Sequence, residues 1–302
     1  MREQGVVQRF ACTQCGKCCN RSPELELSEA ASLSDIFVFR LMFRLYWLPS
    51  QVSDYRRGGD DQPKSSTVFF EKKRLLNTFA ARKYGVKAVR DGKPVAYTKY
   101  LLVSALAFDT IEGKCSALSD KKCAIYERRP LSCRSVPLHY SRAGANAEAD
   151  LEAFVGTSGY RCDTSEAAPI ILENGRIVDP QISAARSAAM ALAAFDRPWS
   201  EAIVRRMNGP ASSEHSLPTL EEVEASAGLG AVTVSMRAAW QVAADNGLIN
   251  SDEFGGLIAL QLRTIRRDLM SGRCSKDAIE TLTQMEEEYS GQGNGNRAIA
   301  IK

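Results

Sequence analysis

Four cysteines within eight positions constrain this chain more than any other feature of its sequence. They occur in "CTQCGKCC" as Cys12, Cys15, Cys18 and Cys19, and eight of the nine cysteines lie before residue 163. The N-terminal stretch "MREQGVVQRF" lacks the apolar core of a secretory signal, which predicts a cytoplasmic location. In that reducing compartment clustered cysteines bind metal or do redox chemistry more often than they form disulfides.

The remaining cysteines of the pattern lie about a hundred residues further along the chain. They occur in "CSALSDKKCAIYERRPLSCRSVP" and "GYRCD". Two-residue spacing lets consecutive sulfurs turn toward one ion, and Gly16 permits the positive φ of a tight turn. We predict eight metal ligands, namely Cys12, Cys15, Cys18, Cys19, Cys115, Cys123, Cys133 and Cys162. We expect Tyr126, Arg129 and Arg134 to support these ligands by hydrogen bonding or charge.

Neighbouring residues seldom aim both side chains at one ion, so Cys18 and Cys19 are predicted to serve different sites. This would tie the N-terminal ribbon to residues 115–162 and make folding depend on metal. Two sets of cofactors remain open. One is a pair of four-thiolate zinc sites, and the other is a 4Fe–4S cluster with the remaining cysteines free or binding a second metal. Uneven spacing and many basic residues favour the 4Fe–4S cluster.

Both cysteine groups also match the pattern of a known family. The first reads CxxCGxCC in "CTQCGKCC", and the second reads CxIYxxRPxxCRxxP in "CAIYERRPLSCRSVP". Over residues 10–165 the chain therefore resembles the YkgJ-type cysteine-cluster family, described as zinc- or iron-chelating domains. The resemblance implies bound zinc or iron, and some members are described as flagellin lysine methylases. The chain departs from a compact family domain by a long insertion and by its C-terminal half.

The elements between the cysteines predict an α+β fold. It comprises an irregular cysteine-rich metal-binding module with short hairpins and helices, followed by a mainly α-helical C-terminal region. "LELSEAASLSDIFVFRLMFRLYW" is predicted as helix, because Arg40 and Arg44 would share one helical face. A helix is also predicted over "FFEKKRLLNTFAARKYG", ending at Gly85. The dipeptides "DG" at 91–92 and "NG" at 174–175 predict hairpins.

Composition divides the chain near residue 180. Residues 1–180 are predicted to form the cysteine-cluster domain, with a helical or loop insertion at about 25–85. Residues 181–290 are rich in alanine and predict a helical region, in which "TLEE" has capping-box spacing and "VTVSMRAAWQVAADNG" is one of the helices. Residues 291–302 are expected to be disordered. No run of apolar residues is long enough for an integral membrane segment.

The distribution of charge along the chain bears on which functions are possible. Residues 1–150 hold 25 Lys and Arg against 16 Asp and Glu, whereas residues 151–302 hold 14 against 20. The favoured function is a metal-binding protein with a structural or redox role, which binds a protein partner through its helical half. The alternatives are an enzyme, either a flagellin lysine methylase type or an Fe–S oxidoreductase, and a zinc-knuckle nucleic-acid binder. We interpret His139 as a structural histidine and Cys274 as a free thiol.

Overall fold

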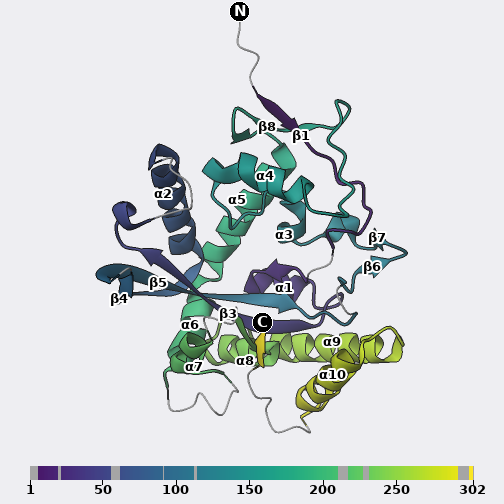
Figure 1. Cartoon of the computed structure of the whole chain (residues 1–302). Helices are drawn as coiled ribbons and strands as arrows, with labels where there is room; N and C mark the ends of the chain where they lie inside the picture. Colours follow the sequence, from purple (N-terminus) through teal and green to yellow (C-terminus); the bar gives the residue numbers. More distant parts are fainter. Residues whose placement is uncertain are drawn as a thin grey trace, which may run out of the picture.

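The computed structural model describes residues 6–19, 22–55, 62–90, 92–111, 114–209, 217–226, 231–291 and 299–301. Within them the chain mixes helix and strand around a six-stranded antiparallel sheet (Figure 1). Its strands are β2 (Glu24–Leu25), β3 (Phe39–Pro49), β4 (Ala80–Arg90), β5 (Lys93–Ala107), β10 (Ala231–Ser235) and β11 (Ile299–Ile301). The order is β11–β10–β3–β5–β2, and β4 pairs with the part of β5 that β2 leaves open.

The helix predicted over "LELSEAASLSDIFVFRLMFRLYW" is confirmed at α1 (Leu27–Ser32) but wrong from Phe39 onward, where the chain forms the central strand β3. It pairs with β5 from Phe39–Ala107 to Pro49–Tyr97 and with β10 on its other side. A spacing of four residues places Arg40 and Arg44 on one face of a helix, but an even spacing also places them on one face of a strand. The aromatic residues of the segment favour the strand once two neighbours supply its hydrogen bonds.

The helix predicted to end at Gly85 ends six residues earlier. Helix α2 spans Gln62–Phe79, and Gly85 lies inside β4, opposite Thr98 of β5. The hairpin expected at residues 91–92 is confirmed, since Arg90 pairs with Lys93. Strands therefore occupy much of the region that was expected to be a helical or loop insertion.

The C-terminal half is mainly helical, as predicted, but it also contributes a strand. The "VTVS" stretch that was predicted as helix forms β10, which pairs with β3. The capping box at Thr219 and Glu222 is confirmed. The helices of this half are α5 (Pro180–Phe195), α6 (Arg197–Met207), α7 (Leu220–Ala225), α8 (Met236–Asp245), α9 (Ser251–Met270) and α10 (Lys276–Tyr289).

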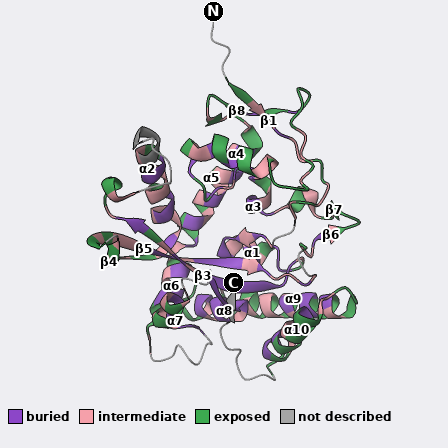
Figure 2. Cartoon of the chain, in the orientation of Figure 1, coloured by how far each residue is buried: buried purple, intermediate pink, exposed green. Residues whose placement is uncertain are grey.

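One hydrophobic core joins the two halves of the chain. It contains Phe39, Leu41 and Phe43 of β3 together with Trp240 of α8 and Ile265 of α9. Buried residues follow the sheet and the helices beside it, whereas the end of the β4–β5 hairpin is largely exposed (Figure 2). The helices α8 and α9 lie along one side of the sheet, while α1 (Leu27–Ser32) and α5 lie on the other (Figure 1).

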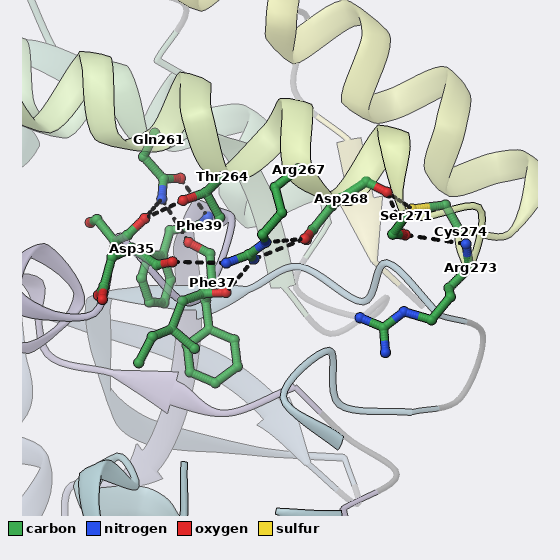
Figure 3. Close-up of polar contacts among 12 residues, drawn as sticks. Asp35, Phe37, Phe39, Gln261, Thr264, Arg267, Asp268, Ser271, Arg273 and Cys274 are labelled. Carbon is green, nitrogen blue, oxygen red and sulfur yellow. Dashed lines mark hydrogen bonds and ion pairs between the residues drawn. The ribbon is translucent and has the colours of Figure 1, made fainter. Parts of the chain in front are cut away.

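A buried glutamine on α9 fixes the chain where α1 leads into β3 (Figure 3). The Oε1 atom of Gln261 accepts a hydrogen bond of 2.9 Å from Phe39 N, and its Nε2 atom donates to the carbonyl oxygens of Ser34 and Phe37 at 2.9 and 2.6 Å. Arg267 follows six residues later on α9 and donates hydrogen bonds to the carbonyl oxygens of residues 35 and 36. These contacts satisfy backbone groups that neither helix nor strand pairs.

Helix α1 also receives its N-terminal cap from a distant residue. Ser28, in the first turn of α1, donates through its backbone N and its Oγ to Asp196 Oδ2, at 2.9 and 3.1 Å. The next residue of α1, Glu29, contacts the short helix α3 (Leu131–Arg134). Its Oε1 atom accepts a hydrogen bond of 2.7 Å from the backbone N of Leu131. Helix α1 therefore links the C-terminal half to the segment that carries Cys133.

Two smaller sheets lie next to the cysteine segments in the chain. One contains β1 (Val7–Arg9), β8 (Ile170–Glu173) and β9 (Arg176–Ile177), and the other contains β6 (Leu118–Ser119) and β7 (Lys122–Cys123). The hairpin predicted at residues 174–175 is confirmed as the β8–β9 turn, where both residues have positive φ. Helix α4 (Ala147–Val155) packs nearby through Leu151.

The described residues contain no helix with the length and apolar character needed to span a membrane. Most of the tail that was expected to be disordered, residues 292–298 and 302, lies outside the described residues. Its Ile299–Ile301 segment is described, and forms β11 against β10.

Candidate metal centre

All eight cysteines predicted as ligands line one pocket. Its cavity volume is about 110 Å³, and the apolar residues Phe10, Phe37, Leu118 and Ile125 form part of its wall. The cysteines come from three segments, which are the N-terminal ribbon, residues 115–133 and the loop before residue 163. They are Cys12, Cys15, Cys18, Cys19, Cys115, Cys123, Cys133 and Cys162. None of them is in a disulfide.

Backbone pairing holds the ribbon beside the loop of Cys162. Ala11 N donates to Asp163 O at 2.8 Å and Asp163 N donates to Ala11 O at 3.1 Å, so Cys12 and Cys162 follow and precede a paired residue. Thr13 Oγ1 adds a hydrogen bond of 2.6 Å to Arg161 O. The pairing of β1 with β8 continues this contact away from the pocket.

Gly16 lets the ribbon approach the β6–β7 hairpin. Its φ is +69°, and a Cβ atom at this position would lie 2.5 Å from the carbonyl oxygen of Lys121. The positive φ predicted for this glycine is therefore confirmed, and the close approach adds a second reason for its lack of a side chain. On the far side of the turn, Cys115 N donates to Cys19 O at 3.0 Å, which holds the end of the ribbon against the second cysteine segment.

Electrostatics show that four of the thiols are mutual neighbours. Burial, together with the nearby thiols of Cys18, Cys15 and Cys12, raises the pKa of Cys162 to about 11. Burial also raises the pKa of Cys12, with Cys18 and Cys15 adding to the effect. Burial acts in the same direction on Cys15, but its hydrogen bonds, first from the Lys17 backbone, leave its pKa lowered.

The thiols of Cys19, Cys115, Cys123 and Cys133 also affect one another's pKa. Burial raises the pKa of Cys115 to about 11 and that of Cys133 to about 12, and Cys123 contributes to both. A hydrogen bond with Cys18 raises the pKa of Cys19, and Cys115 and Cys133 are among its other neighbours. The same hydrogen bond lowers the pKa of Cys18 to about 7.

The residues expected to support the ligands divide between the pocket and a neighbouring contact. Arg129 and Tyr126 both line the pocket, and the guanidinium carbon of Arg129 lies 3.6 Å from the centroid of the Tyr126 ring. The positive charge of Arg129 partly opposes the burial that raises the pKa of Cys12 and Cys133, and it contributes to the lowered pKa of Cys18. Arg134 is not among the pocket residues, and its charge instead acts on Glu29.

Two other candidates lie outside the pocket. His139 Nδ1 contacts Ser141 Oγ at 2.8 Å, and its ring stacks on Tyr140 with centroids 4.3 Å apart. Cys274 Sγ donates to Asp268 O at 3.1 Å beside the C-terminal end of α9 (Figure 3). Sequence reasoning missed the pocket walls formed by Phe10 and Phe37, because neither residue is adjacent to a cysteine in the sequence.

The donor set suits zinc or iron, although the side chains do not form a closed coordination shell. Among the described residues no three Cys, His, Asp or Glu side chains stand together as a formed metal site. Thiols whose pKa is raised by burial remain protonated at neutral pH unless a cation compensates their charge. A bound metal ion supplies that compensation, and soft thiolate ligands are those that zinc and iron–sulfur clusters use.

Comparison with known proteins agrees with this chemistry. No curated protein and no solved structure matches the chain. One family model matches, and it covers residues 70–162. That range includes Cys115, Cys123, Cys133 and Cys162, whereas the "CTQCGKCC" motif lies before it. Residues 70–162 are therefore similar to the family model described as "CxxCxxCC: Putative zinc- or iron-chelating domain", as the resemblance of the cysteine motifs predicts.

Proposed function

We propose that this protein binds an iron–sulfur cluster, zinc, or both through its eight clustered cysteines. The observation that carries the proposal is the single pocket lined by all eight, although they come from three separate segments. A pocket that gathers eight thiols without a disulfide has a strong preference for thiophilic metals. The family match over residues 70–162 independently supports zinc or iron chelation.

The role proposed for the bound group is structural or redox. An iron–sulfur cluster supplies electron transfer, whereas zinc with four thiolates supplies cross-linking between segments. The chain's own residues would hold the group with the eight sulfurs, and Arg129 would offset part of their negative charge. We favour the 4Fe–4S cluster because the uneven spacing of the cysteines suits a centre with several metal ions. Apolar walls, among them Phe10 and Phe37, exclude water from part of the pocket.

Metal analysis of anaerobically purified full-length protein tests the proposal. We expect iron with acid-labile sulfide and visible charge-transfer absorption for a cluster, or zinc in a colourless protein. Cys133→Ala should lower the metal content, whereas Cys274→Ala, a cysteine outside the pocket, should leave it unchanged. Folded wild-type protein that holds neither metal after anaerobic reconstitution would overturn the proposal.

The cytoplasmic location and the protein partner stay predictions. The partner is proposed to bind the helical C-terminal region, where Met270 at the end of α9 is 81% exposed and Ile279 on α10 is 47% exposed. Apolar side chains in such positions support a contact with another protein, because water solvates them poorly.

A further inference from the structure

The hairpin of β4 and β5 carries a concentrated positive charge. Strand β3 ends opposite Tyr97, and the rest of the hairpin, out to Arg90 and Lys93, is largely exposed (Figure 2). The two strands contain no aspartate or glutamate, and their cations are Arg82, Lys83, Lys87, Arg90, Lys93 and Lys99. A dense positive charge on an exposed surface attracts a polyanion.

Three aromatic rings lie on one face of this hairpin and of the adjoining strand β3. Lys99 is paired with Tyr84 on one side and with Trp47 on the other, and residues directly opposite in antiparallel strands share a face. Tyr97, two residues from Lys99, lies on the same face, and its ring centroid is 5.9 Å from that of Trp47. Trp47 is 43% exposed and both tyrosines are half-buried. The rings therefore form a platform on which planar groups can stack.

Exposed cations stand at both ends of this platform. Arg82 lies two residues before Tyr84, and its guanidinium carbon is 5.6 Å from the ring centroid of that tyrosine. Lys93 lies at the other end, four residues before the second tyrosine and on the same face. The central cation, Lys99, is buried and forms an ion pair of 3.0 Å with Glu224 of α7. The positive charge open to a partner on this face is therefore at the two ends.

The combination of rings and cations favours one class of partner. A second copy of this chain would place like charges opposite one another. An anionic membrane would meet the hairpin at its tip, near Val89, whereas the rings lie nearer its base. An acidic polypeptide uses the cations but presents few flat faces to the rings. Single-stranded nucleic acid uses both, because its phosphates pair with cations and its bases stack on aromatic side chains.

We propose that this face of the β4–β5 hairpin binds single-stranded nucleic acid, with Arg82 and Lys93 on phosphates and Trp47 against a base. None of these residues is among those that line the cysteine pocket. The proposal is therefore independent of the metal that the pocket binds.

Tryptophan fluorescence of the full-length protein tests the proposal directly. Trp47 is the exposed tryptophan of the three, since Trp199 and Trp240 are buried. We expect oligo(dT) or oligo(U), long enough to span the hairpin, to quench the Trp47 emission on binding and to bind more weakly as salt is raised. Trp47→Leu should weaken binding about tenfold, whereas Trp47→Phe, which keeps a ring, should stay within about threefold of the wild type.

Two double charge reversals on opposite faces of the hairpin separate a contact from the effect of overall charge. Arg82→Glu with Lys93→Glu should weaken binding by about tenfold or more. Lys83→Glu with Lys87→Glu makes the same change of charge on the other face and should weaken binding by less than about threefold. Anisotropy of a labelled oligonucleotide measures the affinities, and circular dichroism reports whether each variant is folded.

Three outcomes would overturn the proposal. The first is the absence of binding by either oligonucleotide to the wild-type chain at about 50 mM salt, where electrostatic binding is strong. The second is binding without a change in Trp47 emission, or with equal losses in the two folded double variants. The third is tighter binding of poly-glutamate, or of phosphatidylglycerol–phosphatidylcholine vesicles, than of the oligonucleotides, which would assign the hairpin to an acidic polypeptide or to a membrane surface.

Discussion

At the residue scale, one glycine sets the distance between the ribbon and the hairpin. Gly16 and Gly92 both have positive φ, +69° and +74°, but only Gly16 has a neighbouring atom where a Cβ would stand. The two positions therefore separate the effect of backbone strain from that of steric overlap.

Gly16→Ala is expected to destabilise the protein and to lower its metal content, whereas Gly92→Ala should only destabilise it. The strain of a positive φ costs about 1–2 kcal/mol for a residue with a side chain. Gly16→Ala adds an overlap with the Lys121 carbonyl oxygen and should exceed Gly92→Ala by about 2 kcal/mol. Urea unfolding and metal analysis measure the two effects. Equal losses in the two variants would show that the close approach at residue 16 is unimportant.

His139 is a second residue with a measurable consequence. Burial, together with the positive charges of Arg142, Arg186 and Arg44, lowers its pKa from 6.5 to about 4. The unfolded chain therefore binds more protons than the folded chain between these values, and stability falls as the pH drops from 6.5 to 4.

His139→Gln should remove this part of the pH dependence. Between pH 7 and pH 4 the wild-type protein should lose about 3 kcal/mol more unfolding free energy than the variant. Glu29→Gln is a control of opposite sign. Burial raises the pKa of Glu29 to about 7, so the folded chain binds more protons than the unfolded chain between pH 4.5 and 7. The stability that protonated Glu29 contributes is therefore lost as the pH rises through this range. Urea unfolding at a series of pH values measures both slopes, and parallel curves for wild type and His139→Gln would contradict the prediction.

At the element scale, helix α9 uses Gln261 to position the segment that leads into β3. Its amide serves one backbone N–H and two carbonyl oxygens of residues 34–39, in a fully buried position. Because β3 pairs with both β5 and β10, an error in its start would propagate to the centre of the sheet.

Gln261→Leu is expected to lower the unfolding free energy by about 3 kcal/mol, since it leaves buried backbone groups without hydrogen bonds. Gln241→Leu makes the same substitution at an exposed bond to Asp245 and should change stability by less than about 0.5 kcal/mol. Chemical denaturation compares the unfolding free energies of the two variants. A Gln261→Leu variant as stable as wild type would show that residues 34–39 are held by other contacts.

At the scale of the whole molecule, the sheet joins sequence regions that composition separates. The strand β10 comes from the helical half, yet it pairs with β3 from the N-terminal half. Helices α8, α9 and α10 contribute to the same core. Phe37, two residues before β3, belongs to this core and also lines the cysteine pocket, so the pocket wall depends on the core.

A fragment ending at residue 180 is therefore expected not to fold alone, although composition places a domain boundary there. The fragment would lack β10 and would expose the apolar residues of β3 that α8 and α9 cover. Circular dichroism and cooperative thermal unfolding measure this, with the full-length chain as reference. A soluble fragment with a cooperative transition would instead establish residues 1–180 as an independent domain.

The local features of this protein can be predicted from its amino-acid sequence alone. The cysteine spacing, the glycine at residue 16, the two hairpin turns and the capping box at Thr219 depend on residues that are close along the chain. Their geometry follows from the φ and hydrogen-bonding preferences of those residues. These preferences act before any distant contact forms, so a reader of the sequence can find them.

Long-range pairing selects strand over helix in residues 39–49 and 231–235, and it places Cys162 beside Cys12. An apolar segment with polar residues four apart suits either a helix or a strand, and the hydrogen bonds that select the strand come from partners at least 48 residues away along the chain. The grouping of the thiols has the same origin, because it depends on the Ala11–Asp163 bridge and on the contact of Cys115 with Cys19. Such long-range pairings leave no periodic signal in a single sequence.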